Sequence, residues 1–132
     1  MKVYLIDPFT KTVTAVEYDG KSENIYKLID CSLFTVSYIG AEQDAIFIDD
    51  EGLMKKPDSQ EFFLFKRDDG SEQFLAGKGL VVGCDDEGET IEPSVTLDYV
   101  QLRVEFIDNR ENGALYADYL LGQSPVISFV EL

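Results

Sequence analysis

The run Glu61-Phe62-Phe63-Leu64-Phe65-Lys66 is the most apolar stretch of the chain, with four large side chains in succession between two charged ones. A strand with one face in solvent alternates apolar and polar residues, whereas a strand covered on both faces is continuously apolar. The run therefore predicts a central β-strand, and it makes Phe63 a predicted core residue.

Five more short runs, rich in β-branched and aromatic residues, predict strands on either side of this one. They are residues 2–6, 12–18, 33–39, 45–49 and 79–84. Residues 7–11 contain Asp7-Pro8, which favours a turn, so the first two runs are predicted to form a β-hairpin. A polar loop of hairpin length also separates the runs at residues 33–39 and 45–49. The predicted core comprises Leu5, Val13, Leu28, Phe47, Phe63, Leu80 and Val82.

One helix is predicted after Asp19-Gly20. Ser22 is its expected N-cap and Glu23 lies in its first turn, where the helix dipole favours an acid. The residues Ile25, Leu28 and Ile29 have the spacing of one helical face, and the helix should end near Asp30.

The C-terminal third predicts more helix. Pro93, with Ser94 or Thr96, can open a helix that includes Leu97 and Val100. Residues 103–107 fit either its continuation or a strand. Residues 114–121 predict a further helix that stops at Gly122.

These elements predict an α+β fold with a mostly antiparallel sheet of about five to seven short strands and two or three short helices. The antiparallel arrangement follows because the connections are too brief for parallel crossovers. A length of 132 residues fits a single domain, 1–132, in which residues 108–132 are a candidate appended element.

The chain is strongly acidic, with 26 acids, 11 bases and a net charge of −15. Residues 67–132 hold 14 of the acids and four of the bases, a net of −10. Such a surface lacks the cations that neutralise phosphate, so we expect no direct nucleic-acid binding and no attraction to anionic membranes. No apolar run approaches the length of a membrane span, and we expect a cytoplasmic protein.

Familiar catalytic and metal-binding patterns are missing from the sequence. There is no histidine, which removes the commonest general base and zinc ligand. Cys31 and Cys84 lie far apart and predict two buried thiols in a reducing compartment. Gly77-Lys78-Gly79 leads into a strand and predicts a sharp turn or bulge rather than a phosphate-binding loop. We expect no cofactor, no metal site and no enzymatic activity.

Clusters of acids with a glycine follow three of the predicted strands, at residues 49–52, 68–70 and 85–88. Asp and Gly favour turns, and acids keep sheet edges soluble, so a structural role is the simplest interpretation. Neither four-residue cluster has the spacing of an EF-hand calcium loop. As sites of partner binding, the candidate residues are Asp85, Asp86, Glu87, Glu89, Asp49, Asp50 and Glu51.

Three segments resemble small uncharacterised proteins encoded by bacteriophages, prophages and mobile elements. They are Lys2-Val3-Tyr4-Leu5-Ile6-Asp7-Pro8-Phe9, Ile46-Phe47-Ile48-Asp49-Asp50-Glu51-Gly52 and Leu75-Ala76-Gly77-Lys78-Gly79-Leu80-Val81-Val82-Gly83. The resemblance covers residues 1–107 and carries no established activity or catalytic residues. It implies a small accessory protein that acts in a bacterial cytoplasm.

The favoured hypothesis is that the acids dock on a basic protein surface. A DNA mimic or an inhibitor of a bacterial defence system would be one form of this role, with carboxylates in place of phosphates. The alternatives are a structural, self-assembling protein whose acidity is incidental, and a carboxylate-based metal-binding protein or enzyme.

Overall fold

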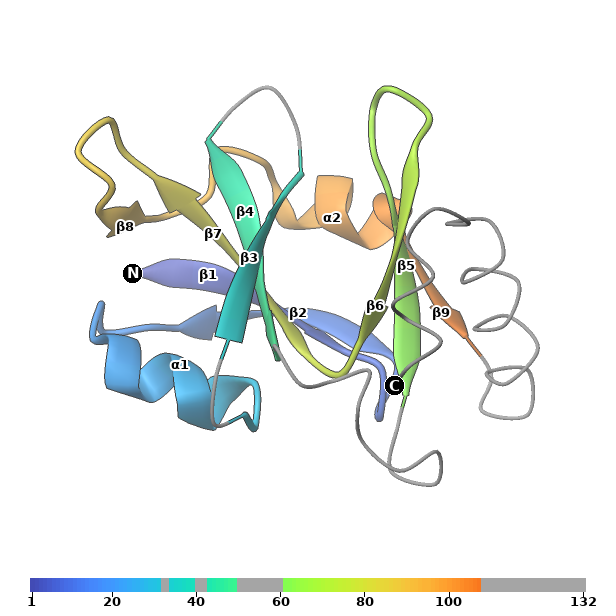
Figure 1. Ribbon diagram of the computed structural model, residues 1–132, viewed down its shortest axis with the longest axis horizontal. Coiled ribbons are helices and arrows are strands. Elements are labelled where there is room, and N and C mark those ends of the chain that lie inside the picture. Colours follow the sequence, from blue (N-terminus) through green and yellow to red (C-terminus); the bar gives the residue numbers. More distant parts are fainter. Residues whose placement is uncertain (32–33, 40–42, 50–60, 108–132) are drawn as a thin grey trace, which may run out of the picture.

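The computed structural model describes residues 1–31, 34–39, 43–49 and 61–107 (Figure 1). These residues form nine strands and two helices, and every strand pair is antiparallel. The α+β, mostly antiparallel fold class is thereby confirmed. The elements are β1 (Lys2–Asp7), β2 (Thr12–Glu17), α1 (Ser22–Leu28), β3 (Phe34–Tyr38), β4 (Asp44–Asp49), β5 (Phe62–Lys66), β6 (Glu72–Ala76), β7 (Gly79–Cys84), β8 (Thr90–Ile91), α2 (Leu97–Arg103) and β9 (Val104–Ile107).

The apolar run at residues 61–66 contains β5, the central strand of a three-stranded sheet in the order β6-β5-β9. Phe63 and Phe65 belong to the core between the sheets, whereas Phe62 and Leu64 pack in a second cluster on the opposite face. Both faces of β5 are covered, which explains why its sequence shows no alternation.

A six-stranded sheet has the order β2-β1-β7-β4-β3, with β8 paired to the end of β7. The two predicted hairpins, β1–β2 and β3–β4, are present. The expectation of one sheet of five to seven strands needs correction: β5 lies in the second sheet, and β6, β8 and β9 bring the described strands to nine.

The chain crosses from one sheet to the other at Gly77-Lys78-Gly79, between β6 and β7. Gly77 has φ +84°, a left-handed conformation, and its N–H donates to the carbonyl of Glu61 at 2.8 Å. Gly79 leaves room for a neighbouring ring. The predicted turn is present, and it bends the chain out of one sheet and into the other.

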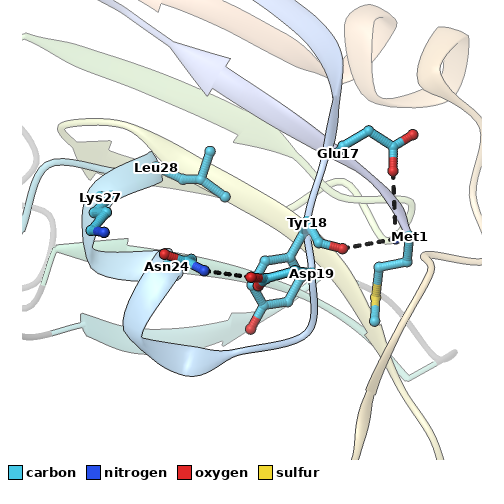
Figure 2. A pocket seen from close by; sticks show the side chains of 7 residues that line it. All are labelled: Met1, Glu17, Tyr18, Asp19, Asn24, Lys27 and Leu28. Atoms are coloured by element: carbon cyan, nitrogen blue, oxygen red, sulfur yellow. Dashed lines mark hydrogen bonds and ion pairs between the residues drawn. The ribbon is translucent and has the colours of Figure 1, made fainter.

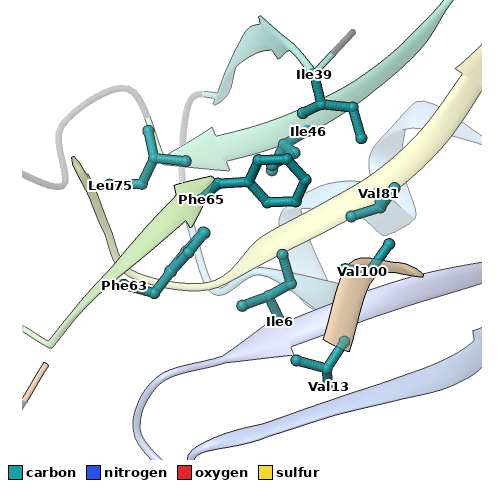
Figure 3. Packing of buried hydrophobic residues seen from close by; sticks show 9 residues of the cluster. All are labelled: Ile6, Val13, Ile39, Ile46, Phe63, Phe65, Leu75, Val81 and Val100. Atoms are coloured by element: carbon teal, nitrogen blue, oxygen red, sulfur yellow. The ribbon is translucent and has the colours of Figure 1, made fainter. Parts of the chain in front are cut away.

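The main core lies between the two sheets. In Figure 3, Phe63 and Phe65 project from β5 toward Ile6, Ile46 and Val81 of the first sheet. Helix α2 adds Val100, which is fully buried, while the side-chain amide of Gln101 donates to the carbonyl of Val13 at 3.0 Å. Helix α2 therefore joins the edge strand β2 to the core.

Helix α1 covers the other face of the first sheet, where Ile25 and Ile29 pack with Val3, Phe47 and Leu80. The predicted residues Leu5 and Leu28 lie at the border of this cluster and are only partly buried. The predicted N-cap, Ser22, is the first helical residue instead. Lys21 is the N-cap and forms no side-chain capping bond.

The C-terminal predictions are resolved as far as residue 107. Thr96 is the N-cap of α2, and its side chain accepts a hydrogen bond from the N–H of Tyr99 at 3.2 Å. The ambiguous segment 103–107 is a strand, β9, apart from Arg103, which ends α2. The predicted helix 114–121 and the candidate appended element 108–132 lie outside the described residues.

Candidate functional site

The hairpin turn between β7 and β8 holds the densest run of predicted binding residues. One oxygen of the Asp85 carboxylate accepts the N–H groups of Glu87 and Glu89, both at 2.9 Å. The Asp85 N–H donates to the Glu89 carbonyl at 2.9 Å, and Gly88 has φ +84°. Asp85 is half-buried and therefore organises the turn rather than facing a partner. We call residues 85–89 the acidic turn.

Three carboxylates of the acidic turn point into solvent. Asp86, Glu87 and Glu89 are exposed, and of the three only Asp86 has a side-chain partner within the described part of the chain, the amide of Gln43 at 3.2 Å. Among the described residues, no Lys or Arg forms an ion pair with any of them. The turn therefore presents three negative charges that no described Lys or Arg neutralises.

Some acids elsewhere in the described part of the chain form ion pairs. Arg103 pairs with Asp68 at 2.5 Å, and its guanidinium carbon lies 4.3 Å from the centre of the Tyr99 ring. Lys78 pairs with Asp30 at 2.5 Å. Similar pairs join Lys66 to Glu105 at 3.6 Å and the amino terminus to Glu17 at 3.5 Å. The exposed acids of the acidic turn differ from these acids because no cation at residues 1–31, 34–39, 43–49 or 61–107 pairs with them.

The turn between β5 and β6 repeats the construction seen at Asp85. One oxygen of Asp69 accepts hydrogen bonds from the N–H and the hydroxyl of Ser71, at 2.8 and 2.6 Å. These bonds, the hydroxyl bond foremost, lower the pKa of Asp69, since they stabilise its charged form. Asp19 stabilises the turn after β2 in a similar way, because its carboxylate accepts hydrogen bonds from the N–H of Lys21 and the side-chain amide of Asn24. Part of the acidity of the chain thus shapes its turns.

Asp49, the one described residue of the other predicted cluster, 49–51, does not lie at the acidic turn. Asp49 was predicted as a partner-binding acid, which requires an exposed carboxylate. It is the last residue of β4 and is only 7% exposed. Because β4 and β7 run antiparallel, with Ile48 opposite Gly79, Asp49 lies about 24 Å along the sheet from the start of the acidic turn. Asp50 and Glu51 lie outside the described residues.

A cavity of about 460 Å³ adjoins the acidic turn. Its lining includes Asp44, Asp86 and Glu92 and, among the described residues, no Lys or Arg. Asp44 is 3% exposed, and its carboxylate accepts the N–H and hydroxyl of Ser94, at 2.9 and 2.7 Å, and the N–H of Val95 at 3.1 Å. Asp44 thus holds the segment after β8 against the sheet.

Sequence reasoning missed Asp44 because it placed the residue in the loop before β4. The signal that could have identified it is the residue's position directly before the unbroken apolar run Ala45-Ile46-Phe47. Gly83 completes this site, since a Cβ there would stand 2.5 Å from the Glu92 carbonyl oxygen.

Cys84 also lines this cavity. It is a half-buried thiol, and Cys31 is also half-buried, so neither is as deeply buried as predicted. Burial raises the pKa of the Cys84 thiol, and the charges of Asp85 and Asp44 add to the effect. A thiol held in its neutral form is a poor nucleophile. Among the described residues no group of three or more acids and cysteines is placed to hold a metal ion.

A second cavity, of about 480 Å³, lies beside α1 (Figure 2). Some of its charged groups have partners: the amino group of Met1 donates to the Tyr18 carbonyl at 2.7 Å and pairs with Glu17. The amide of Asn24 donates to Asp19 at 2.6 Å. These contacts join the start of β1 to the end of β2, and α1 to the segment after β2.

In the described part of the chain, neither helix has the length and apolar character required to cross a lipid bilayer.

Residues 1–105 match the family model described as a domain of unknown function, DUF3846. No curated protein and no solved structure matches the chain.

Proposed function

Because the chain belongs to the DUF3846 family, to which no function is assigned, we propose a function from its electrostatics: the acidic turn docks on a basic protein surface. The observation that carries the proposal is the absence of any described cation beside Asp86, Glu87 and Glu89. Charges without internal partners remain free to attract a partner of opposite sign.

The geometry of the turn supports this proposal. The carboxylate of Asp85 fixes the backbone of the turn by accepting hydrogen bonds from two N–H groups. The neighbouring carboxylates therefore project from a pre-organised hairpin. A pre-organised element loses little conformational entropy on binding. The adjoining cavity, lined by Asp44, Asp86 and Glu92, extends the negative surface.

The chemistry of the partner follows from the sign of this surface. Clustered Lys and Arg occur on proteins that bind phosphate groups, so the proposed partner is a nucleic-acid-binding protein whose phosphate site the carboxylates occupy. In this proposal the protein is a phage-type accessory protein in a bacterial cytoplasm, acting as a DNA mimic or an inhibitor of host defence.

The test replaces Asp86→Asn, Glu87→Gln and Glu89→Gln together and leaves Asp85 in place, so that the turn keeps its hydrogen bonds. A matched control replaces three other exposed acids, Glu23→Gln, Glu72→Gln and Asp98→Asn, with the same change in net charge. The partner is the protein captured from bacterial lysate by the immobilised wild-type chain and identified by mass spectrometry.

Association rates are then measured for each variant. The triple variant of the acidic turn should associate at least about tenfold more slowly, since steering charges act mainly on the on-rate. The control should keep a rate close to that of the wild type. Binding should also weaken as salt rises from about 0.1 M to about 1 M, because the Debye length falls from about 10 Å to about 3 Å. Equal rates for the two triple variants, or salt-independent binding, would refute the proposal.

A further inference from the structure

Strand β3 is the last strand at one edge of the first sheet among the described residues. The N–H of Ile39 donates to the carbonyl of Asp44 at 3.2 Å, which makes these opposite residues a hydrogen-bonded pair. Such pairs alternate along an antiparallel ladder. The N–H and C=O groups of Phe34, Val36 and Tyr38 therefore point away from β4.

The position of Arg67 supports this orientation. Its Nε donates to the carbonyl oxygen of Tyr38 at 3.2 Å, from the side opposite β4. A carbonyl oxygen has two lone pairs, so this contact leaves Tyr38 able to accept a second hydrogen bond. The outer edge of β3 thus offers backbone groups at three alternate residues, spaced to pair with another extended chain.

The side chains of this edge are unusual in so acidic a chain. The sequence Phe34-Thr35-Val36-Ser37-Tyr38 carries no charge, and it has neither the proline nor the lysine that commonly protect an edge strand. Val36 is 40% exposed and Tyr38 is 63% exposed. Phe34 already contacts two rings, those of Tyr26 and Phe47, with centroids at 5.3 and 5.0 Å.

We propose that β3 pairs with β3 of a second copy of this chain, antiparallel and centred on Val36. This register places Val36 opposite Val36 and Tyr38 opposite Phe34 of the other copy. All three outward-facing residues then form hydrogen-bonded pairs, and the two six-stranded sheets become continuous. In this register Tyr38 of each copy lies beside Phe34 of the other copy. Such aromatic cross-strand pairs stabilise sheets.

A second copy fits this edge better than a basic partner does. The strand itself offers no acid to a basic partner, and the charged group in contact with it, Arg67, is a cation. Two uncharged, identical strands can approach without local repulsion. The remaining repulsion comes from the net charge of −15 on each copy and acts over longer range. Salt should therefore strengthen this association, the opposite of its effect on docking by the acidic turn.

A disulfide test examines the register directly. Opposite residues in a hydrogen-bonded antiparallel pair have Cα atoms about 5.5 Å apart, within the range that a disulfide spans. The variant Val36→Cys should therefore form an intermolecular disulfide under mild oxidation, with the wild type showing the background from Cys31 and Cys84. Tyr38→Cys is the matched control, because its two thiols would be separated by about 14 Å along the strands.

Sedimentation velocity tests the association itself. The wild type should show a concentration-dependent species of twice the 14.9 kDa mass, more abundant in about 1 M than in about 0.1 M salt. Val36→Lys should lose it, since two like charges would lie opposite each other. Leu102→Lys, which changes an 85%-exposed residue on α2 and alters the charge equally, should retain it.

Two results would overturn the proposal: a monomer at millimolar protein in about 1 M salt, or equal cross-linking of the Val36→Cys and Tyr38→Cys variants. The triple variant of the acidic turn should dimerise at least as well as the wild type. Failure of one proposal therefore leaves the other standing.

Discussion

The ring of Phe63 lies against the backbone of Gly79, so closely that a Cβ at Gly79 would stand 3.0 Å from Phe63 Cζ. Phe63 is central in the second sheet, and Gly79 is the first residue of β7 in the other. The two sheets approach each other at a position where one of them has no side chain.

Gly79→Ala should therefore destabilise the fold by about 1–3 kcal/mol, the usual cost of overpacking a filled core. The added methyl group would also stand 2.9 Å from Ile46 Cγ2. Urea denaturation measures the change. In the background of Phe63→Leu, whose shorter side chain leaves space, the same substitution should cost less. A cost that is unchanged in this background would show that Phe63 is not the obstacle.

Phe63→Ala should lower the free energy of unfolding by about 3–5 kcal/mol, because its ring is fully buried in the core between the sheets. Phe9→Ala is the matched control, since that ring is 52% exposed. It should cost well under half as much. Thermal denaturation followed by circular dichroism can compare the two, and losses of similar size would mean that β5 does not hold the sheets together.

Asp44→Ala should destabilise the fold by about 1–3 kcal/mol, because it leaves the N–H groups of Ser94 and Val95 without their acceptor. Asp86→Asn, an exposed change at the same cavity, should stay within about 0.5 kcal/mol of the wild type. Hydrogen exchange adds a local measurement: faster exchange at residues 94 and 95 in Asp44→Ala is expected. Unchanged protection there would contradict the role assigned to Asp44.

Alkaline pH should weaken the fold through Tyr4. Burial raises the pKa of the Tyr4 phenol, and the charges of Asp44 and Glu92 raise it further. The stability this provides is fully present below the unfolded pKa of about 10 and is lost as pH rises through the folded value. The neutral phenol also donates to the Val95 carbonyl at 2.8 Å, which a phenolate cannot do.

Denaturation at about pH 8 and about pH 11, on either side of the ordinary tyrosine pKa, tests this expectation. Tyr4→Phe should be less stable than the wild type at the lower pH, where it lacks the hydrogen bond. It should then lose less stability on going to the higher pH. An equal loss in both proteins would exclude Tyr4 as a source of the alkaline transition.

Much of the fold was predictable because local patterns and burial agree. The hairpins of β1–β2 and β3–β4 have turn residues between short β-rich runs, and both are present. Strand β6 was missed although Asp69-Gly70 marks a hairpin turn before it. Phe74 and Ala76 are buried on one face and Leu75 on the other, so the expected alternation is absent.

The division into two sheets could not be predicted for a related reason. The runs of β5 and β7 are both continuously apolar. Such a pattern predicts a strand buried on both faces, but it does not predict which strands pair with it. The partition depends on Gly77, whose left-handed conformation turns the chain between the sheets. In the site, Asp85 and Asp49 looked alike in sequence because each is the first acid of a cluster. Their burial and bonding depend on neighbours far along the chain.

The central position of β7 has a consequence for how the chain folds. Strands β1–β2, β3–β4 and β5–β6 each pair with their neighbour in sequence, so each can form locally. Among the described strands, the first two hairpins do not pair with each other directly. They belong to one sheet because β7 pairs with β1 on one side and with β4 on the other. During synthesis, a nascent chain that has not yet exposed residues 79–84 would hold separate hairpins with unsatisfied edges. We expect folding to be a late, cooperative event, limited by the closure of long loops around one strand.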